Sequence, residues 1–145
     1  MFTLKDIISV LNETDDELKN LEYLLEEFKD TKWEDYIEFS DDKYKRNDIF
    51  KNKRYEIILI CWKKNQFSRI HNHPKYGCIF KVLKGQLSEF VYNKNLNLIE
   101  SKNHTINSTG YIDDSIGYHR VGNDLKEDAI SIHIYSPPDF LAYNF

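Results

Sequence analysis

His71 and His73, separated by one residue, stand in the stretch FSRIHNHPKYGCIFKVLKG, and Cys78 follows five positions after His73. A third histidine, His119, lies much later, in the segment GYIDDSIGYHRVGN. Imidazole nitrogens and thiolates are ligands for transition metals, and imidazole binds iron, nickel, copper and zinc. If the fold brings the three histidines together, they form a metal site, but their spacing does not determine which metal.

Each of these residues also has an ordinary structural explanation. An HxH pair occurs by chance, and a single loop histidine such as His119 need not bind anything. His104, in the polar stretch SKNHTINS, is expected to lie at the surface. Cys61, beside Trp62 at the end of an apolar segment, is expected to be a small buried hydrophobic residue.

The segments that must position these residues begin at Tyr55. They are short, rich in β-branched and aromatic residues, and separated by Gly, Asn, Asp or Pro, which is typical of strands. The segments are YEIILICW, CIFKVLKG, LSEFVYN, GYIDDSIG and AISIHIYS. Residues two apart in a strand share a face. His71 and His73 therefore point the same way if RIHNH is extended, and Pro74 disfavours a helical conformation of His73.

The segment AISIHIYS separates apolar from polar side chains by face. Three isoleucines alternate with three polar residues, in the order Ile130, Ser131, Ile132, His133, Ile134, Tyr135. The polar face is either exposed to water, as in many antiparallel sheets, or it lines an interior pocket. In the second case the isoleucines pack against another layer, such as the helices. The alternation alone allows both interpretations.

Residues 1–40 are predicted to be helical. Thr3 and Asp6 form a capping-box pattern ahead of an apolar stripe, and Thr14 and Glu17 repeat the pattern. The second apolar stripe is expected to pack against the rest of the same domain. Its members are Leu18, Leu21, Leu24, Leu25 and Phe28. Helices followed by a run of short strands predict an antiparallel barrel or sandwich with helical decoration.

Composition narrows the class of protein. A chain of 145 residues fits a single domain, 1–145, with the helical part in 1–40 and the barrel in 44–140. The net charge is −4 and no basic run stands out, so we expect no nucleic-acid partner. The sequence has neither a long apolar run for a membrane span nor the pattern of a signal peptide. Two cysteines make a poor disulfide framework, so a reducing cytoplasm is expected.

Together these motifs resemble the cupin superfamily, and within it the cysteine dioxygenases. Cupins carry an HxH pair and a closing glycine, which His71, His73 and Gly85 match, and a third histidine in a later motif, which His119 matches. Cys78 stands where other cupins have an acidic ligand, as in cysteine dioxygenases of the eukaryotic type. The resemblance covers 44–140, with its segments in the family's order. It implies a small, jelly-roll-like antiparallel β-barrel, mainly β, with N-terminal α-helices.

The resemblance implies a mononuclear Fe(II) cofactor bound by His71, His73 and His119. A third imidazole in place of a carboxylate ligand leaves more positive charge on the metal, which favours an incoming thiolate. In the family, the residue matching Cys78 is joined by a thioether bond to the tyrosine matching Tyr135.

The resemblance also implies a substrate site. The residue matching Arg46 binds the substrate carboxylate through the planar fork of its guanidinium, and Tyr44 lies nearby. Ser131 and His133 match a pair that hydrogen-bonds to the Tyr135 hydroxyl. The expected catalytic residues are therefore Tyr135, Cys78, His133 and Ser131. Without the resemblance, Arg46 in KYKRNDIFKNKR is better explained as a solvent-exposed residue of a charged loop.

The expected activity is thiol dioxygenation, in which O2 converts L-cysteine to cysteine sulfinate. Two alternatives stay open: a dioxygenase of another small thiol such as 3-mercaptopropionate, and a non-catalytic cupin that binds a metal or a thiol. The expected partners are a small thiol and O2, with no membrane, and a monomer is the default. Two departures from the family, Gly77 before the cysteine and a chain that ends soon after Tyr135, are expected to affect substrate preference rather than iron binding.

Overall fold

The chain begins with short helices and continues as strands. In residues 2–145, which the computed structural model describes, the helical elements are α1 (Leu4–Glu13), the 3-10 turn η1 (Leu18–Asn20), α2 (Tyr23–Glu26) and the 3-10 turn η2 (Lys32–Tyr36). The strands are β1 (Lys45–Lys51), β2 (Glu56–Trp62), β3 (Gln66–Phe67), β4 (Cys78–Lys84), β5 (Leu87–Tyr92), β6 (Leu98–His104), β7 (Thr109–Ile112), β8 (Tyr118–Asn123) and β9 (Ala129–Tyr135). None of the described helices is long and apolar enough to cross a membrane.

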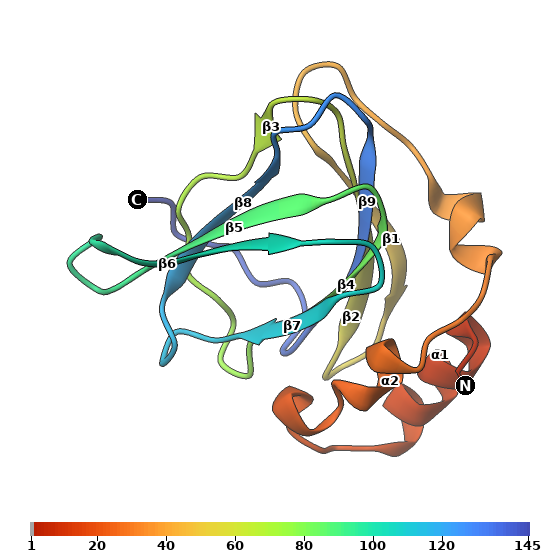
Figure 1. Cartoon of the computed structure of the whole chain (residues 1–145). Helices are drawn as coiled ribbons and strands as arrows, with labels where there is room; N and C mark the ends of the chain where they lie inside the picture. The colour runs from red at the N-terminus through yellow and green to blue at the C-terminus, as the bar shows by residue number, and fades with distance from the viewer. Residues whose placement is uncertain (1) are drawn as a thin grey trace.

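The strands form two antiparallel sheets (Figure 1). The larger sheet has the order β1-β2-β9-β4-β7 and the smaller has the order β3-β8-β5-β6. Residues of both sheets line one cavity, which places that cavity between the sheets. The prediction of a mainly antiparallel β fold with N-terminal helices is confirmed. The barrel is an open one, because no strand ladder joins the two sheets within the described residues.

The strands β2 and β9 pair in the middle of the larger sheet, with Glu56 opposite Tyr135 and Trp62 opposite Ala129. The three isoleucines of β9 belong to one apolar cluster with β2 and with the leucines of the N-terminal helices. On the opposite face of β9, Ser131 and His133 are buried as well. Both faces of this strand are therefore covered, and the polar row lies in the interior.

The N-terminal region bears out one of its two predicted caps. The Thr3 hydroxyl accepts a hydrogen bond from the Asp6 N–H, and the Asp6 carboxylate accepts one from the Thr3 N–H, which completes the capping box of α1. The second predicted box is wrong, because the Thr14 hydroxyl accepts from the N–H of Asp16 and forms a turn. No side chain caps η1. The leucine stripe is interrupted by turns but is buried against the larger sheet as expected.

Four strands, β1, β3, β6 and β8, were not predicted. Two of these, β1 and β6, lie in charged stretches of the sequence. Both are edge strands, and their sequences, KRNDIFK and LIESKNH, are largely polar. Charged side chains on an edge strand discourage pairing with other chains, and they also hide the alternation that marks a strand. The predicted strand GYIDDSIG ends early, because the Asp113 carboxylate accepts hydrogen bonds from the N–H groups of Ser115 and Ile116 and turns the chain after β7.

Candidate metal centre and adjoining pocket

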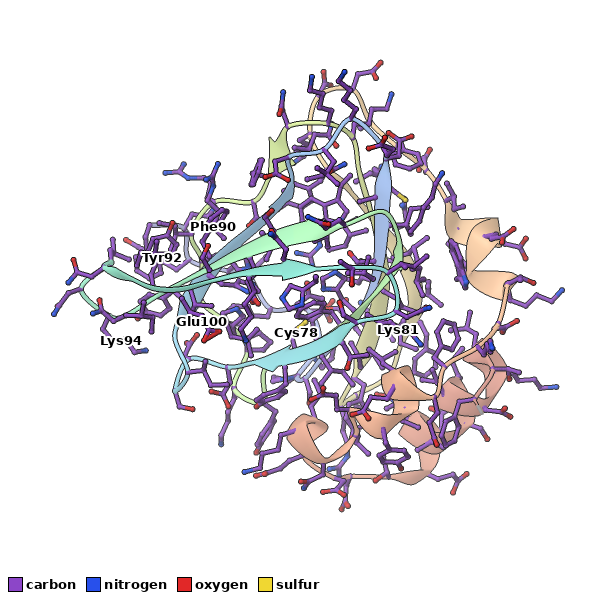
Figure 2. All side chains as sticks on the ribbon, viewed as in Figure 1. Cys78, Lys81, Phe90, Tyr92, Lys94 and Glu100 are labelled. Atoms are coloured by element: carbon purple, nitrogen blue, oxygen red, sulfur yellow. The ribbon has the colours of Figure 1, made fainter. Side chains whose placement is uncertain are left out.

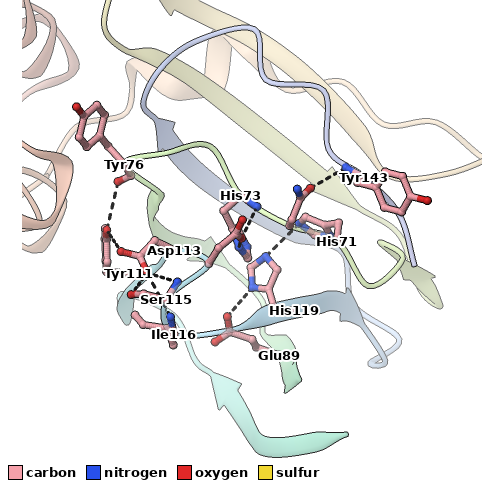
Figure 3. A network of polar contacts seen from close by, with 12 residues as sticks. His71, His73, Tyr76, Glu89, Tyr111, Asp113, Ser115, Ile116, His119 and Tyr143 are labelled. Atoms are coloured by element: carbon pink, nitrogen blue, oxygen red, sulfur yellow. Dashed lines mark hydrogen bonds and ion pairs between the residues drawn. The ribbon is translucent and has the colours of Figure 1, made fainter. Parts of the chain in front are cut away.

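The three histidines singled out by their spacing meet between the sheets. His71 forms an isolated antiparallel bridge with His119 of β8, in which the His71 N–H donates to the His119 carbonyl at 3.0 Å and the His119 N–H donates to the His71 carbonyl at 3.2 Å. His73 follows in the connection before β4. One ring nitrogen from each of the three lies within 4.8 Å of the other two (Figure 3).

Hydrogen bonds at the outer nitrogens fix the orientation of the first two rings. The His71 Nδ1–H donates to the Arg69 carbonyl at 2.8 Å. The His73 Nδ1–H donates to Asp114 Oδ1 at 3.1 Å, and the same oxygen accepts from the His73 main-chain N–H at 2.8 Å. A carbonyl or a carboxylate only accepts, so each Nδ1 carries the proton and each Nε2 presents a lone pair.

The third ring is held in the same way by a buried carboxylate. The His119 Nδ1–H donates to Glu89 Oε2 at 2.7 Å. Its Nε2 then faces the Nε2 of His71 at 3.2 Å. Hydrogen bonding of the outer imidazole nitrogen to a carboxylate or a carbonyl is typical of histidines that bind a metal.

The arrangement fits a metal ion on two observations. Two lone pairs facing one another, as those of His71 and His119 do, are favourable only if an electropositive atom lies between them, and nitrogens bound at right angles about 2.1 Å from one metal lie about 3 Å apart. The Nε2 atom of His73 is buried and has no hydrogen-bond partner. Buried polar atoms without a partner are rare and require an explanation, which a shared metal ion provides.

Burial keeps the imidazoles of His71 and His73 neutral. It lowers the pKa of His71 from the ordinary value of 6.5 to about 4, with a further contribution from the neighbouring His119. It lowers the pKa of His73 to about 2, again with the other two histidines contributing. Neutral imidazole is the form that binds a metal, so His71 and His73 need not release protons at neutral pH.

The polar row of β9 forms one wall of the adjoining pocket. The Trp62 indole N–H donates to the Ser131 hydroxyl at 3.0 Å, and that hydroxyl lies 2.7 Å from His133 Nε2. The His133 Nδ1 faces the Cys78 sulfur at 3.7 Å. The rings of His133 and Tyr135 stack at 5.9 Å between centroids.

This wall differs from what the resemblance implied. Ser131 bonds to His133 and to Trp62, and His133 faces the Cys78 sulfur, so the pair does not bond together to the Tyr135 hydroxyl. Residues two apart lie about 7 Å apart along a strand, so Ser131 reaches His133 but not Tyr135. Both ring nitrogens of His133 face other atoms, Nε2 the Ser131 hydroxyl and Nδ1 the Cys78 sulfur.

Stability should depend on the pH through His133. Burial, and secondly the Arg46 guanidinium, lowers the pKa of His133 from 6.5 to about 3 in the folded protein. Below pH 6.5 His133 is protonated in the unfolded chain but not in the folded chain. The free energy of unfolding therefore falls as the pH drops from 6.5 toward 3. The loss is at most about 1.4 kcal/mol per pH unit for this group.

Urea unfolding of the metal-free protein at several pH values measures this effect. The variant His133→Asn removes the titrating group, so its free energy of unfolding should fall less steeply over the same pH range. Equal slopes in the parent and the variant would show that His133 is protonated in the folded protein as readily as in the unfolded one.

Cys78 and Tyr135 are neighbours across the β4–β9 pairing and pack in one cluster. Figure 2 shows the Cys78 side chain in the interior of the fold, whereas Lys94 lies on the exposed hairpin between β5 and β6. Burial raises the pKa of both the Cys78 thiol and the Tyr135 hydroxyl.

Gly77, which precedes Cys78, has φ +81°, and a Cβ there would lie 2.3 Å from the Ile112 carbonyl oxygen. A glycine is therefore required for this entry into β4.

Arg46 lies on β1 opposite Ile60, not in a loop. Its side chain is exposed, but it also lines the interior pocket, and its guanidinium carbon lies 5.3 Å from the centre of the Tyr135 ring. Tyr44 stacks on Trp62 at 4.7 Å between ring centroids and lines the same pocket. Arg46 and Tyr44 thus line the same pocket as His71 and His119, and their role in substrate binding stays a prediction.

Sequence reasoning missed three residues that support the histidines. The expectation that His104 lies at the surface is wrong: it is buried on β6, and its Nε2–H donates to Glu89 Oε1 at 2.8 Å. Glu89 alternates with Leu87 and Val91 on β5, so an acidic residue at an inward-facing position could have been noticed. Asp114 stands in a turn, where an aspartate is common for local reasons, and nothing in the sequence marks it.

Burial raises the pKa of Glu89, but hydrogen bonds from His104 and His119 outweigh it and hold that pKa below the usual range. Glu89 is therefore an anion with both oxygens occupied.

Comparison with known sequences identifies relatives along almost the entire chain. The family model described as cysteine dioxygenase type I matches residues 3–144. Cysteine dioxygenase type 1 of Rattus norvegicus is 34% identical over 150 residues, which cover 94% of this chain and 75% of the rat protein. The Homo sapiens protein of the same name is 33% identical with the same coverage.

Comparison with solved structures gives the same fold at much lower sequence identity. A protein with a double-stranded β-helix domain from Klebsiella pneumoniae has a TM-score of 0.67 and 14% identity, covering 79% of this chain and 88% of that one. A cupin superfamily protein from Desulfitobacterium hafniense has a TM-score of 0.57 and 9% identity, covering 69% and 83%. These similarities establish a cupin fold.

Proposed function

The chain belongs to the cysteine dioxygenase type I family, and from this premise we propose that it is a thiol dioxygenase that uses Fe(II) and O2 to convert L-cysteine to cysteine sulfinate. The observation that carries the proposal is the convergence of the Nε2 atoms of His71, His73 and His119 beside Arg46. In this reaction the thiol sulfur is oxidised, O2 is reduced, and both oxygen atoms enter the product, so no other reductant is needed.

His71, His73 and His119 would hold the iron through Nε2. When bound, Fe(II) supplies the redox chemistry that brings O2 and the thiol sulfur together. The protein supplies neutral ligands in fixed orientations, as the hydrogen bonds to their Nδ1 atoms indicate. A metal also favours the thiolate form of a bound thiol.

Arg46 would bind the carboxylate of cysteine, because the planar guanidinium matches a carboxylate with a pair of hydrogen bonds. The pocket beside the histidines has a volume of about 30 Å³, room for little more than a water molecule. Arg46 also lines a larger hollow of about 630 Å³ beside β1. A substrate would approach through that hollow, and the Arg46 side chain would shift to admit it while its guanidinium binds the carboxylate.

Tyr135 would act as a hydrogen-bond donor to the reacting groups. Burial raises the pKa of its hydroxyl, with the neighbouring Cys78 contributing, so it keeps its proton at neutral pH. Ser131 and His133 would hold this side of the pocket in place through the chain of contacts from Trp62 to Cys78.

We further propose that residues 1–145 act as a single domain in the cytoplasm, as a monomer. Cys61 and Cys78 are free and buried rather than joined in a disulfide, which is consistent with a reducing compartment.

Oxygen consumption by the iron-loaded protein with L-cysteine tests the activity, with the product identified by mass spectrometry. The expected result is stoichiometric uptake of O2 and formation of cysteine sulfinate. A clear preference for 3-mercaptopropionate over cysteine would make the protein a dioxygenase of that thiol. Bound Fe(II) and a folded protein without uptake on either thiol would leave a cupin that only binds a metal or a thiol.

A thioether between Cys78 and Tyr135 is expected to form during turnover. The bond replaces one hydrogen on the sulfur and one on the ring, and O2 accepts the two electrons and two protons, so the intact mass of the protein should fall by a pair of hydrogen atoms after reaction with cysteine and O2. The variant Cys78→Ser should keep its mass. Mass spectrometry of the parent before and after turnover checks this, and an unchanged parent mass would refute it.

A further inference from the structure

Behind the metal site, three side chains form a continuous hydrogen-bonded row across the smaller sheet. His119 on β8, Glu89 on β5 and His104 on β6 come from three adjacent strands. The His119 Nδ1–Glu89 Oε2 distance is 2.7 Å and the Glu89 Oε1–His104 Nε2 distance is 2.8 Å. All three residues are buried, with exposed fractions of 6%, 4% and 8%.

The hydrogen-bond partner that orients His119 differs in kind from the partners of the other two histidines. His71 is held by a main-chain carbonyl, which the backbone itself fixes. His73 is held by Asp114, whose same oxygen also accepts from the His73 main-chain N–H. His119 is held only by the side-chain carboxylate of Glu89. That carboxylate can rotate unless its other oxygen, Oε1, is also hydrogen-bonded.

The other oxygen is held by His104. The His104 ring is itself fixed, because it packs edge-on against Phe80 at 4.9 Å and 87°, and its main chain pairs with Leu87 of β5. Without this donor, Glu89 Oε1 would be a buried charged oxygen lacking a partner. Such a group costs free energy and turns to find another donor, which would rotate Oε2 away from His119.

We propose that His104 is a positioning residue of the metal site: it holds Glu89 so that Glu89 orients the His119 imidazole with Nε2 toward His71 and His73. The proposal rests on the proposed metal-binding function of the three histidines. His104 does not touch the metal or the substrate, and it acts through Glu89 alone.

Metal affinity is the measurement that tests this proposal, with Co²⁺ as the probe in calorimetric titrations of the full chain. Loss of the outer hydrogen-bond partner of a metal-bound histidine costs about 10- to 100-fold in affinity. His104→Leu removes the hydrogen-bond donor to Glu89 rather than the partner of His119 itself. It should therefore weaken Co²⁺ binding by about 10-fold, the lower end of that range. His104→Gln, whose amide can donate to the same oxygen, should bind Co²⁺ nearly as tightly as the parent.

The matched control is Ser88→Ala. The Ser88 hydroxyl donates to Asn103 Oδ1 at 3.1 Å, across the same strands β5 and β6, at the register position next to His104. This variant disturbs the same strand pair but leaves Glu89 and His104 in contact, so its affinity for Co²⁺ should equal that of the parent.

Melting temperatures with and without Co²⁺ separate positioning from a purely structural role. A structural role lowers both temperatures equally, whereas a positioning role reduces the rise that Co²⁺ produces. If His104→Leu does not fold, His104→Asn, whose shorter amide does not reach Glu89, takes its place. If a variant that lacks the His104 donor binds Co²⁺ as tightly as the parent, the proposal for His104 is overturned and the proposed function stands. A parent that binds no Co²⁺ overturns the proposed function itself.

Discussion

Replacement of His119 by alanine is expected to abolish metal binding and oxygen consumption together. The variant loses one of the three Nε2 atoms that converge on the site. It also leaves Glu89 Oε2, a buried charged oxygen, without the donor it has at 2.7 Å. Loss of an outer hydrogen-bond partner lowers metal affinity by about 10- to 100-fold. Loss of a ligand itself should lower the affinity by more than this.

Two measurements check this expectation: Fe²⁺ affinity under anaerobic conditions, and O2 uptake with cysteine at saturating Fe²⁺. The matched control is Arg120→Ala. Arg120 is the next residue on β8, points to the opposite face and stacks on Phe67 at 4.4 Å. The control should bind Fe²⁺ and consume O2 like the parent. Undiminished Fe²⁺ affinity in a folded His119→Ala protein would rule out His119 as a ligand.

Replacement of Arg46 by methionine is expected to impair the reaction with cysteine far more than the reaction with a thiol that has no carboxylate. A hydrogen bond to a charged group contributes about 1.5–3 kcal/mol, so kcat/KM for cysteine should fall about 10- to 150-fold. Arg46→Lys keeps the charge but not the planar fork, and it should recover only part of this loss. Cysteamine, which is cysteine without the carboxylate, should react equally with the parent and with both variants.

Lys45→Met is the matched control for charge. Lys45 neighbours Arg46 on β1, points to the other face of the strand and contacts Glu38 at 3.7 Å. Its loss removes one positive charge from the same strand without changing the pocket, so kcat/KM for cysteine should stay close to that of the parent. An equal fall of kcat/KM for cysteine and cysteamine in Arg46→Met would exclude recognition of the carboxylate by Arg46.

The features that the sequence predicted correctly are those set by local backbone geometry. Alternation along a strand places every second side chain on one face, and this is why the isoleucines of β9 and its polar row separate as expected. The capping box at Thr3 depends on residues three apart, so it too is visible in the sequence. The histidine spacing and the order of the motifs were sufficient for the family, which the comparisons confirm.

The errors concern features that depend on contacts between distant residues. His104 stands in a polar stretch, yet β5 and β8 place a buried carboxylate beside it. For Arg46, which stands in a charged stretch, only the resemblance pointed to the pocket, and pairing with β2 is what turns its side chain toward it. The second capping box failed because the Thr14 hydroxyl had a nearer donor in the Asp16 N–H.

The sequence by itself thus determined which residues share a face, which family the chain resembles and which histidines are the candidate ligands. Only the tertiary structure decided which faces are buried, and therefore that Glu89 and His104 stand behind His119. The physical reason is that backbone geometry sets the direction of a side chain relative to its neighbours in the strand. Whether that direction leads to water or to a buried partner is set by strands far away in the sequence.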